Sequence, residues 1–392
     1  MLCSLLISFI LAFVLHSENA QAAECRVPAI LNAHENVWEN RTLHPTSLYR
    51  LKVEQAVAAI KDEELKERAS RVADFGTFVW IKSLEDIRAI PPVADEVPCD
   101  EILGLVLDNL PYKVAPSNSP SPDYDPKTED DYLSLYIEPL ATIIKAHPNV
   151  AFAVAIEPGA FPQCFNATIA PAPSEHEANL VRSYNTNIPV ALDKLNLLNV
   201  IMYLDVGHSN SLDWAWHRNG TADAIVHLYK AAKQPAQLRG FATNVANWNA
   251  WDLSPGEFAR ADDSRDVRPS NEKNFQRILS SALQARGMSA PATHAILDTS
   301  RNGVMGLRWF WDEWCNVDGA GLGARPSAET GDDTLDAFVW VKGPGESDGV
   351  SSERGGDEVG CAAKTAVRPA PERDVWFQGF FEMLVRNAHP KL

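Results

Sequence analysis

Seven short apolar segments, separated by stretches with helical periodicity, limit this chain to very few folds. The segments predict strands at residues 75–81, 103–107, 150–156, 200–204, 240–246, 295–297 and 337–341. Between them, stretches such as 132–146, 222–232 and 272–286 carry the pattern of amphipathic helices. Strands that are apolar throughout and alternate with helices are typical of parallel strands buried on both faces. The sequence therefore predicts an α/β fold, a single closed or nearly closed parallel β/α barrel of about seven strands, with an open doubly wound sheet as the alternative.

The first residues have the features of a secretory signal peptide. Residues 5–15 form an apolar run, and polar residues and the small-residue pattern Ala20–Gln21–Ala22 follow it. The run is too short to cross a bilayer, and no later segment is apolar for long enough. We therefore expect residues 1–22 to be removed and residues 23–392 to form a single secreted, extracellular domain that does not enter a membrane.

Export makes disulfide bonds possible between the cysteines that follow the signal peptide. These are Cys25, Cys99, Cys164, Cys315 and Cys361. Because their number is odd, at least one of them has no partner within the chain. No pair of cysteines or histidines has the spacing of a zinc site, and we expect no metal and no organic cofactor. Glycosylation sequons that also fit an exported protein begin at Asn40, Asn166 and Asn219.

The charge balance excludes one large class of partners. The chain carries 35 Lys and Arg against 52 Asp and Glu, a formal net charge of −17. A surface this acidic repels phosphate backbones, so nucleic acids are not expected as partners. No G-x-G-x-x-G pattern follows a predicted strand, which argues against a dinucleotide site. We expect the protein to be a monomer.

Polar and aromatic residues follow the predicted strands one after another. They are Trp80, Lys82, Asp108, Glu157, Asp205, His208, Asn244, Asn247, Asp298, Arg301, Lys342, Glu346 and Asp348. In a β/α barrel the functional site lies at the carboxyl ends of the strands. Their recurrence at strand after strand predicts that these side chains gather in one site.

Tryptophan is concentrated in one part of the chain. Eight of the eleven tryptophans lie between Trp214 and Trp340. Those in or near predicted loops are Trp214, Trp248, Trp251, Trp311 and Trp314. Flat indole rings beside hydrogen-bonding groups suit pyranose rings, which have apolar faces and hydroxyl edges. Together with carboxylates at the strand ends, they predict a carbohydrate-active protein.

Several stretches resemble glycoside hydrolase family 6, the secreted cellobiohydrolases and endoglucanases. The similarity lies in residues 199–208, 238–247, 314–317, 323–331, 338–349 and 376–378, and extends over nearly the whole mature chain. The resemblance implies a distorted parallel β/α barrel, β-1,4-glucan or cellooligosaccharide as substrate, and hydrolysis with inversion by an acid and a base. No Ser/Thr/Pro-rich linker leads to a small Cys-rich module, so a separate carbohydrate-binding module is not expected.

The resemblance also implies roles for individual residues. Asp348 matches the carboxylate proposed as the catalytic base. Positions that contact substrate in the family are matched by Trp80, His208, Trp214, Asn247, Trp314, Lys342 and Glu346. Lys82 stands where the family usually has an acidic residue, and Ser211 replaces a tryptophan that stacks on glucose. Trp248 is expected to add an aromatic face along the same groove.

The family resemblance extends to the cysteines. Cys315 and Cys361 match a disulfide bond that braces a loop over the active site. Cys99 and Cys164 are the expected second pair, with Cys25 as a competing partner because the positions are shifted from the family's other pair.

The general acid of the family is missing from the matched position. Residues 156–159 read Ile-Glu-Pro-Gly where the family has Ile-Glu-Pro-Asp, so the acid position is Gly159. Val114 stands at the carboxylate that supports the acid, and Leu107 at the tyrosine that distorts the sugar. These losses favour a protein that binds β-glucan but hydrolyses it poorly or not at all. The alternatives are an active glucanase that uses Asp108 or Asp205 as a relocated acid, and a structural relic that no longer binds sugar.

Overall fold

The computed structural model describes residues 27–113, 129–209, 214–253, 271–310, 312–352, 355–356 and 359–392. The side chains of residues 129, 214–219, 355, 356 and 359 are not among those described. The predicted signal peptide, Cys25, Val114, Ser211, Trp311 and the side chain of Trp214 therefore lie outside the described residues.

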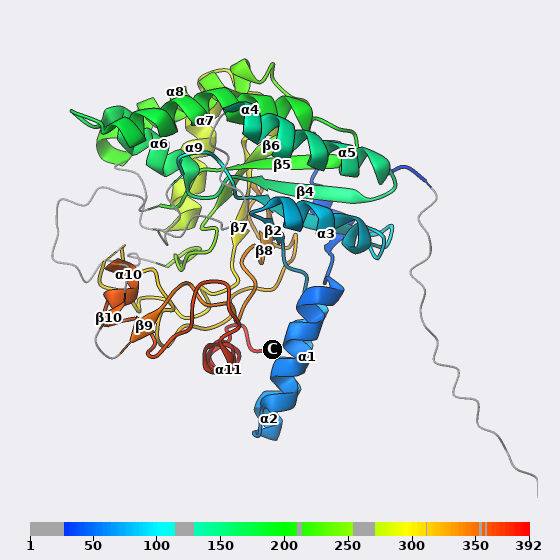
Figure 1. Ribbon diagram of the computed structural model, residues 1–392, viewed down its shortest axis with the longest axis vertical. Helices are drawn as coiled ribbons and strands as arrows, with labels where there is room; N and C mark the ends of the chain where they lie inside the picture. Colours follow the sequence, from blue (N-terminus) through cyan, green and yellow to red (C-terminus); the bar gives the residue numbers. More distant parts are fainter. Residues whose placement is uncertain are drawn as a thin grey trace, which may run out of the picture.

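A parallel sheet curls into a nearly closed, distorted barrel at the centre of the molecule (Figure 1). Its strands are β1 (Thr42–Leu43), β2 (Val79–Ile81), β3 (Glu101–Leu107), β4 (Ala151–Ile156), β5 (Val200–Asp205), β6 (Leu238–Thr243), β7 (His294–Asp298) and β8 (Leu335–Val339). From β3 to β8 each strand pairs in parallel with the next in sequence, and β1 and β2 both pair with β3. Just before β2, the Phe78 amide donates over 3.2 Å to the carbonyl of Trp340, just after β8. The predicted barrel is confirmed, and the open doubly wound sheet is wrong.

Each of the seven predicted segments overlaps a strand. In the first segment the strand β2 begins only at Val79, and residues 75–78 form a bend and an irregular stretch after the 3₁₀ helix η2 (Arg71–Asp74). A two-stranded hairpin, β9 (Ser351–Ser352) and β10 (Gly355–Gly356), lies outside the barrel sheet. Strands of two residues leave no periodic signal in a sequence, and these were not predictable from the pattern.

Helices lie around the barrel, and some of them lie away from the sheet at one end of the molecule (Figure 1). They are α1 (Ser47–Ala59), α2 (Glu63–Ser70), α3 (Leu84–Ala94), α4 (Glu129–Asp131), α5 (Glu138–Ala146), α6 (Ala160–Ile169), α7 (Glu175–Lys194), α8 (Trp214–Ala231), α9 (Glu272–Gln284), α10 (Val359–Ala362) and α11 (Gln378–Arg386). Short 3₁₀ helices η1 (Val37–Glu39) and η4 (Ala290–Thr293) and a π-helical segment η3 (Tyr132–Ile137) complete the set. The three helical stretches predicted from periodicity are all confirmed. None of the described helices is both long enough and apolar enough to span a membrane.

The two faces of the sheet bury different kinds of side chain. On β4, Phe152, Val154 and Ile156 point outward into the layer between sheet and helices, whereas Ala151, Ala153 and Ala155 point into the barrel. Alternation along a strand gives each face every second residue. Small residues inside leave room for larger inward side chains from the neighbouring strands.

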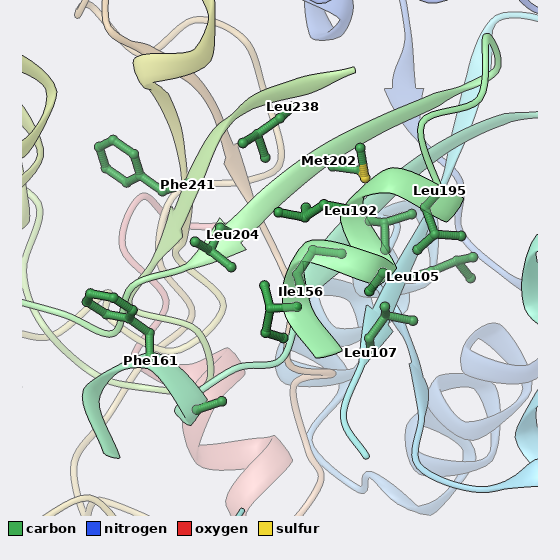
Figure 2. Packing of buried hydrophobic residues seen from close by; sticks show 14 of the residues in the cluster. Leu105, Leu107, Ile156, Phe161, Leu192, Leu195, Met202, Leu204, Leu238 and Phe241 are labelled. Atoms are coloured by element: carbon green, nitrogen blue, oxygen red, sulfur yellow. The ribbon is translucent and has the colours of Figure 1, made fainter. Parts of the chain in front are cut away.

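The outer layer is the largest apolar cluster (Figure 2). Figure 2 shows Leu107, Ile156 and Leu204 from the ends of three strands beside Leu192 and Leu195 at the end of α7. Each fully buried side chain of this kind contributes about 1.5–3 kcal/mol to folding. Leu107, which the sequence resemblance matches to the family's sugar-distorting tyrosine, is completely buried in this layer.

A buried charged cluster lies near the amino ends of the strands, opposite the predicted site. Asp336 of β8 accepts two hydrogen bonds from the guanidinium of Arg239 on β6, at 2.8 and 2.7 Å. It also accepts the Tyr203 hydroxyl at 2.9 Å and lies 3.1 Å from Nδ1 of His294. Burial alone would raise the pKa of Asp336, but its bonds to Arg239 and His294 outweigh burial and lower it. The cluster links β5, β6, β7 and β8 inside the molecule.

Candidate functional site

Polar and aromatic residues lie at or just after the carboxyl ends of successive strands of the barrel. This group, called the strand-end site below, comprises Trp80, Asp108, Glu157, Asp205, His208, Asn247, Asp298, Arg301, Lys342, Glu346 and Asp348. Direct contacts connect its parts: Asp298 accepts the backbone amides of Ala246 at 2.9 Å and Lys342 at 3.1 Å. Among the described residues, no group of His, Cys, Asp and Glu side chains is arranged to hold a metal ion.

Gly159 begins α6 in the left-handed region of backbone space, with φ of 75° and ψ of −10°. Among the described residues, a Cβ atom added there would come within 4 Å only of Nε2 of Gln163, at 3.8 Å. The amide of Gly159 donates over 2.9 Å to Oδ1 of Asp205. Gly159, the position that the sequence resemblance assigns to the family's acid, therefore offers a backbone N–H group and no side chain.

Asp205, the last residue of β5, is 1% exposed. Its Oδ1 accepts the amide of Gly207 at 3.0 Å as well as that of Gly159. Burial, the largest cause, raises the pKa of Asp205 to about 7, against the opposing effect of these amides and of Lys113. A carboxyl group with such a pKa carries a proton for part of the time at neutral pH.

The raised pKa of Asp205 makes a prediction for stability. The folded state holds the proton up to about pH 7, whereas an unfolded Asp releases it near pH 3.9, so folding loses free energy as pH rises between these values. Asp205→Asn keeps an acceptor for both amides and removes the titration. We expect the variant's free energy of unfolding to gain up to about 4 kcal/mol relative to wild type between pH 4 and pH 8. Urea unfolding at both pH values measures this, and parallel pH profiles would contradict it.

Glu157 is fully buried and already has four donors. Its carboxylate accepts the amides of Asn109 at 3.0 Å and Leu110 at 3.1 Å, the Tyr132 hydroxyl at 3.0 Å and the Lys113 ammonium at 2.6 Å. The Lys113 ammonium also contacts Asp108. Burial would lower the pKa of Lys113, but the two carboxylates outweigh it and raise that pKa. Glu157 and Asp108 thus both hold a buried cation, and Glu157 is not available as an acid.

Asp348 is held by a fully buried arginine. Nη1 of Arg301 lies 2.7 and 2.8 Å from the two carboxylate oxygens, and the amide of Asn316 donates to Oδ2 over 2.9 Å. The guanidinium of Arg301 also stacks on the Trp248 ring, 4.0 Å from its centre. Two sides of the Asp348 carboxylate are therefore fixed in position, as a base that orients a water molecule requires.

Trp248 does not present its ring to a sugar, contrary to the prediction. It is 3% exposed, packs edge-to-face against Phe380 at 6.0 Å and is covered by Arg301. Its indole N–H donates over 2.7 Å to the carbonyl of Trp314. Trp248 belongs to the apolar core under the site, where it supports Trp314 and Arg301.

Trp80 and two lysines form the second half of the site. The half-buried Trp80 ring has the ammonium groups of Lys82 and Lys342 at 5.1 and 5.7 Å from its centre. Both ammonium groups bind Asp374, each over 2.5 Å, and Lys342 also lies 3.4 Å from Glu346. The two lysines lower the pKa of Asp374 more than burial raises it. The lysine that departs from the family pattern is thus paired with an aspartate 292 residues away.

His208 and Asn247 rest on a buried polar network. Nδ2 of Asn249 lies 3.2 Å from Nδ1 of His208 and donates over 2.8 Å to Glu272. The Arg308 guanidinium donates to Oδ1 of Asn247 at 3.1 Å and to Oδ1 of Asn249 at 2.5 Å. Burial raises the pKa of Glu272 to about 6. Asn249, Glu272 and Arg308 fix the two predicted substrate contacts, and no sequence pattern pointed to them.

Trp314 is half-buried and has the Arg373 guanidinium 5.4 Å from its ring centre. The next residue, Cys315, forms the predicted disulfide bond with Cys361, which is confirmed. The other predicted pair is wrong: Cys164 is free and buried on α6, while Cys99 is disulfide-bonded to another cysteine. Cys164 lies in the apolar layer between α6 and the sheet, where burial raises the pKa of its thiol to about 11.

Comparison with known proteins places this arrangement in one family. The family model described as "Glycosyl hydrolases family 6" matches residues 38–388. A relative from Podospora anserina named 1,4-beta-D-glucan cellobiohydrolase CEL6C is 42% identical over 372 residues, 94% of this chain and 92% of the relative. Exoglucanase 3 of Agaricus bisporus is 32% identical over 91% of this chain and 80% of its own length.

Solved structures give the same result. Cellobiohydrolase II (Cel6A) from Humicola insolens, in complex with glucose and cellotetraose, superposes with a TM-score of 0.82 at 29% identity, covering 91% of this chain and 100% of the other. Endoglucanase CEL6B from the same organism has a TM-score of 0.76 at 29% identity, covering 91% and 99%. Because the family model matches most of this chain, residues 38–388, the chain belongs to glycosyl hydrolase family 6.

Proposed function

We propose that this protein is a secreted family 6 homologue that binds β-1,4-glucan at the strand-end site and hydrolyses it poorly or not at all. The observation that carries the proposal is the acid position. Gly159 has no side chain there, and its N–H group is bonded to Asp205. The base, the stacking residues and their supports are present beside this gap.

Sugar binding is supported by the half-buried aromatic side chains Trp80 and Trp314 and the polar groups between them. Lys342 and Glu346 lie within 3.4 Å of each other beside Trp80. His208 and Asn247 are held by buried partners, so little conformational freedom is lost when they bind a hydroxyl group. The Humicola insolens relative in complex with cellotetraose supports a cellooligosaccharide as the ligand.

Weak hydrolysis follows from the requirement for two groups. Inverting glycosidases need one carboxylic acid to protonate the leaving oxygen and a second carboxylate to activate water on the opposite face. Asp348 is suited to the second role through its bonds to Arg301 and Asn316. For the first role Glu157 is occupied by Lys113 and two backbone amides. Loss of a general acid costs about 10²–10⁴-fold in rate.

A second candidate function is retained because of Asp205. Its pKa is raised to about 7 and it lies 2.9 Å from the amide of Gly159, so it combines the position and proton affinity of a relocated acid. Against this role, it is 1% exposed, and one of its oxygens accepts two amides. The alternative is an active glucanase with Asp205 as the acid.

Calorimetry with cellotetraose and a hydrolysis assay on the same protein test the proposal. We expect a dissociation constant between micromolar and millimolar, about −8 to −4 kcal/mol. Trp314→Ala should weaken binding by roughly two- to tenfold because it removes one stacking ring, whereas Trp314→Phe should retain part of it. Turnover should lie about 10²–10⁴-fold below that of an active member of the family.

Two outcomes would reject parts of this proposal. Rapid hydrolysis that is lost in Asp205→Asn and in Asp348→Asn would establish an active enzyme with a relocated acid. No heat and no tryptophan fluorescence change with cellotetraose would leave only a structural relic.

A further inference from the structure

Trp309 and Phe310 are exposed side by side on the loop between β7 and β8. Their side chains are 56% and 62% exposed, and Met305 on the same loop is 39% exposed. Large aromatic rings left in water at a protein surface mark interaction sites more often than isolated aliphatic side chains do. These two rings take no part in the strand-end site described above.

The loop holds the two residues in a fixed arrangement. A single carboxylate oxygen of Glu313 accepts the amides of Trp309 at 2.6 Å and Phe310 at 3.1 Å. The amide of Glu313 donates back to the carbonyl of Phe310 over 3.3 Å. The turn is thereby closed at its base, and both rings project from it. A backbone that is held in place loses little further entropy when the rings it carries bind a flat ligand.

The pair is continuous with the strand-end site through its neighbours in sequence. Arg308, directly before Trp309, is 4% exposed and donates to Asn247 and Asn249. Trp314, one residue after Glu313, lies on the same loop. One end of this loop therefore contacts the predicted sugar site, and its aromatic pair lies on the surface beside that site.

We propose that Trp309 and Phe310 form a second platform, outside the strand-end site, on which a β-1,4-glucan chain at a cellulose surface stacks. The inference rests on the proposed function. A glucan chain is longer than one site, and its apolar sugar faces match flat aromatic rings. The acidic charge of the protein, −17, disfavours anionic membranes and nucleic acids as occupants.

Two measurements test the platform: retention of the protein on microcrystalline cellulose, and its affinity for cellotetraose by calorimetry. We expect Trp309→Ala/Phe310→Ala to lower the cellulose partition coefficient roughly tenfold and to leave cellotetraose affinity unchanged. Trp309→Tyr/Phe310→Tyr should still be retained on cellulose, because the flat rings remain. Trp309→Leu/Phe310→Leu should no longer be retained on cellulose, because an apolar side chain without a flat face does not stack on a sugar ring. The matched control is Leu198→Ala, which removes a side chain that is 69% exposed just before β5, at the other end of the strands.

The results of these measurements distinguish the platform from other roles of the two rings. Equal retention by wild type and the alanine pair, or an equal loss in Leu198→Ala, would overturn the platform. Sedimentation that shows a dimer in wild type and a monomer in the alanine pair would assign the rings to self-association instead. Cellulose retention that depends on the pair, without cellotetraose heat, would reject the strand-end site as a sugar site and keep the platform.

Discussion

Gly159→Asp is expected to raise the rate of cellotetraose hydrolysis by about 10²-fold or more, because it restores a general acid. Among the described residues the position has space, since an added Cβ atom meets only Gln163, at 3.8 Å. The backbone is left-handed there, with φ of 75°, a conformation that Asp and Asn tolerate better than other residues with a side chain. The new carboxyl and the neighbouring Asp205, whose pKa is raised to about 7, cannot both ionise readily, so the pair would hold one proton near neutral pH.

The matched control is Gly159→Asn. Asn has the same size and the same tolerance for this backbone, but it has no proton to donate. Hydrolysis in the Asp variant and none in the Asn variant would assign the gain to acid catalysis. A second step adds Val114→Asp, the supporting carboxylate of the family. Leu107→Tyr is a poor addition, because Leu107 is fully buried in the layer between sheet and helices.

A folded Gly159→Asp/Val114→Asp variant as inert as wild type would contradict the proposal that the missing acid limits the rate. Hydrolysis that already exists in wild type and does not rise in the Asp variant would do the same. In that second case Asp205→Asn becomes the decisive variant, because it removes the alternative acid while retaining a hydrogen-bond acceptor.

The barrel was predictable from the sequence because its signals are local. Each buried strand is a continuous apolar run, and each intervening helix has its own period. The polar residues at the strand ends were also predictable, since parallel strands bring their carboxyl ends to the same edge. Lys342, Glu346 and Trp80 lie together as predicted.

The partners of the site residues were not predictable, because they come from distant segments. Lys82 pairs with Asp374, 292 residues away, and Asp348 with Arg301, 47 residues away. Trp248 follows a strand as the other predicted site residues do, but its ring packs under Arg301 and against Phe380. Likewise, cysteine spacing does not show that Cys164 faces the apolar layer of α6. The direction in which a side chain points, and the pairing of residues that are far apart in the sequence, depend on the tertiary structure. Local sequence patterns therefore do not predict them.

Removal of the Asp336 carboxylate is expected to cost about 3–5 kcal/mol of unfolding free energy. Asp336→Asn would leave the Arg239 guanidinium buried without a counter-charge, with Arg239 and Asp336 side chains only 4% and 2% exposed. The surface pair Lys233–Asp193, at 2.8 Å but 77% and 42% exposed, provides the matched control. Asp193→Asn should cost less than about 1 kcal/mol, because water and salt screen exposed pairs.

Urea unfolding of the two variants and wild type measures both values. The pKa of Asp336 is lowered in the folded protein. The ionised Asp336 therefore adds to the free energy of unfolding above the pKa of an unfolded Asp, about 3.9, and this stabilisation is lost as the pH falls below that value. The gap between wild type and Asp336→Asn should therefore shrink in acid. Arg239→Met/Asp336→Leu, which removes both charges, should recover part of the lost stability. Equal, small effects of Asp336→Asn and Asp193→Asn would mean that the strands stay together at this end of the barrel through apolar packing alone.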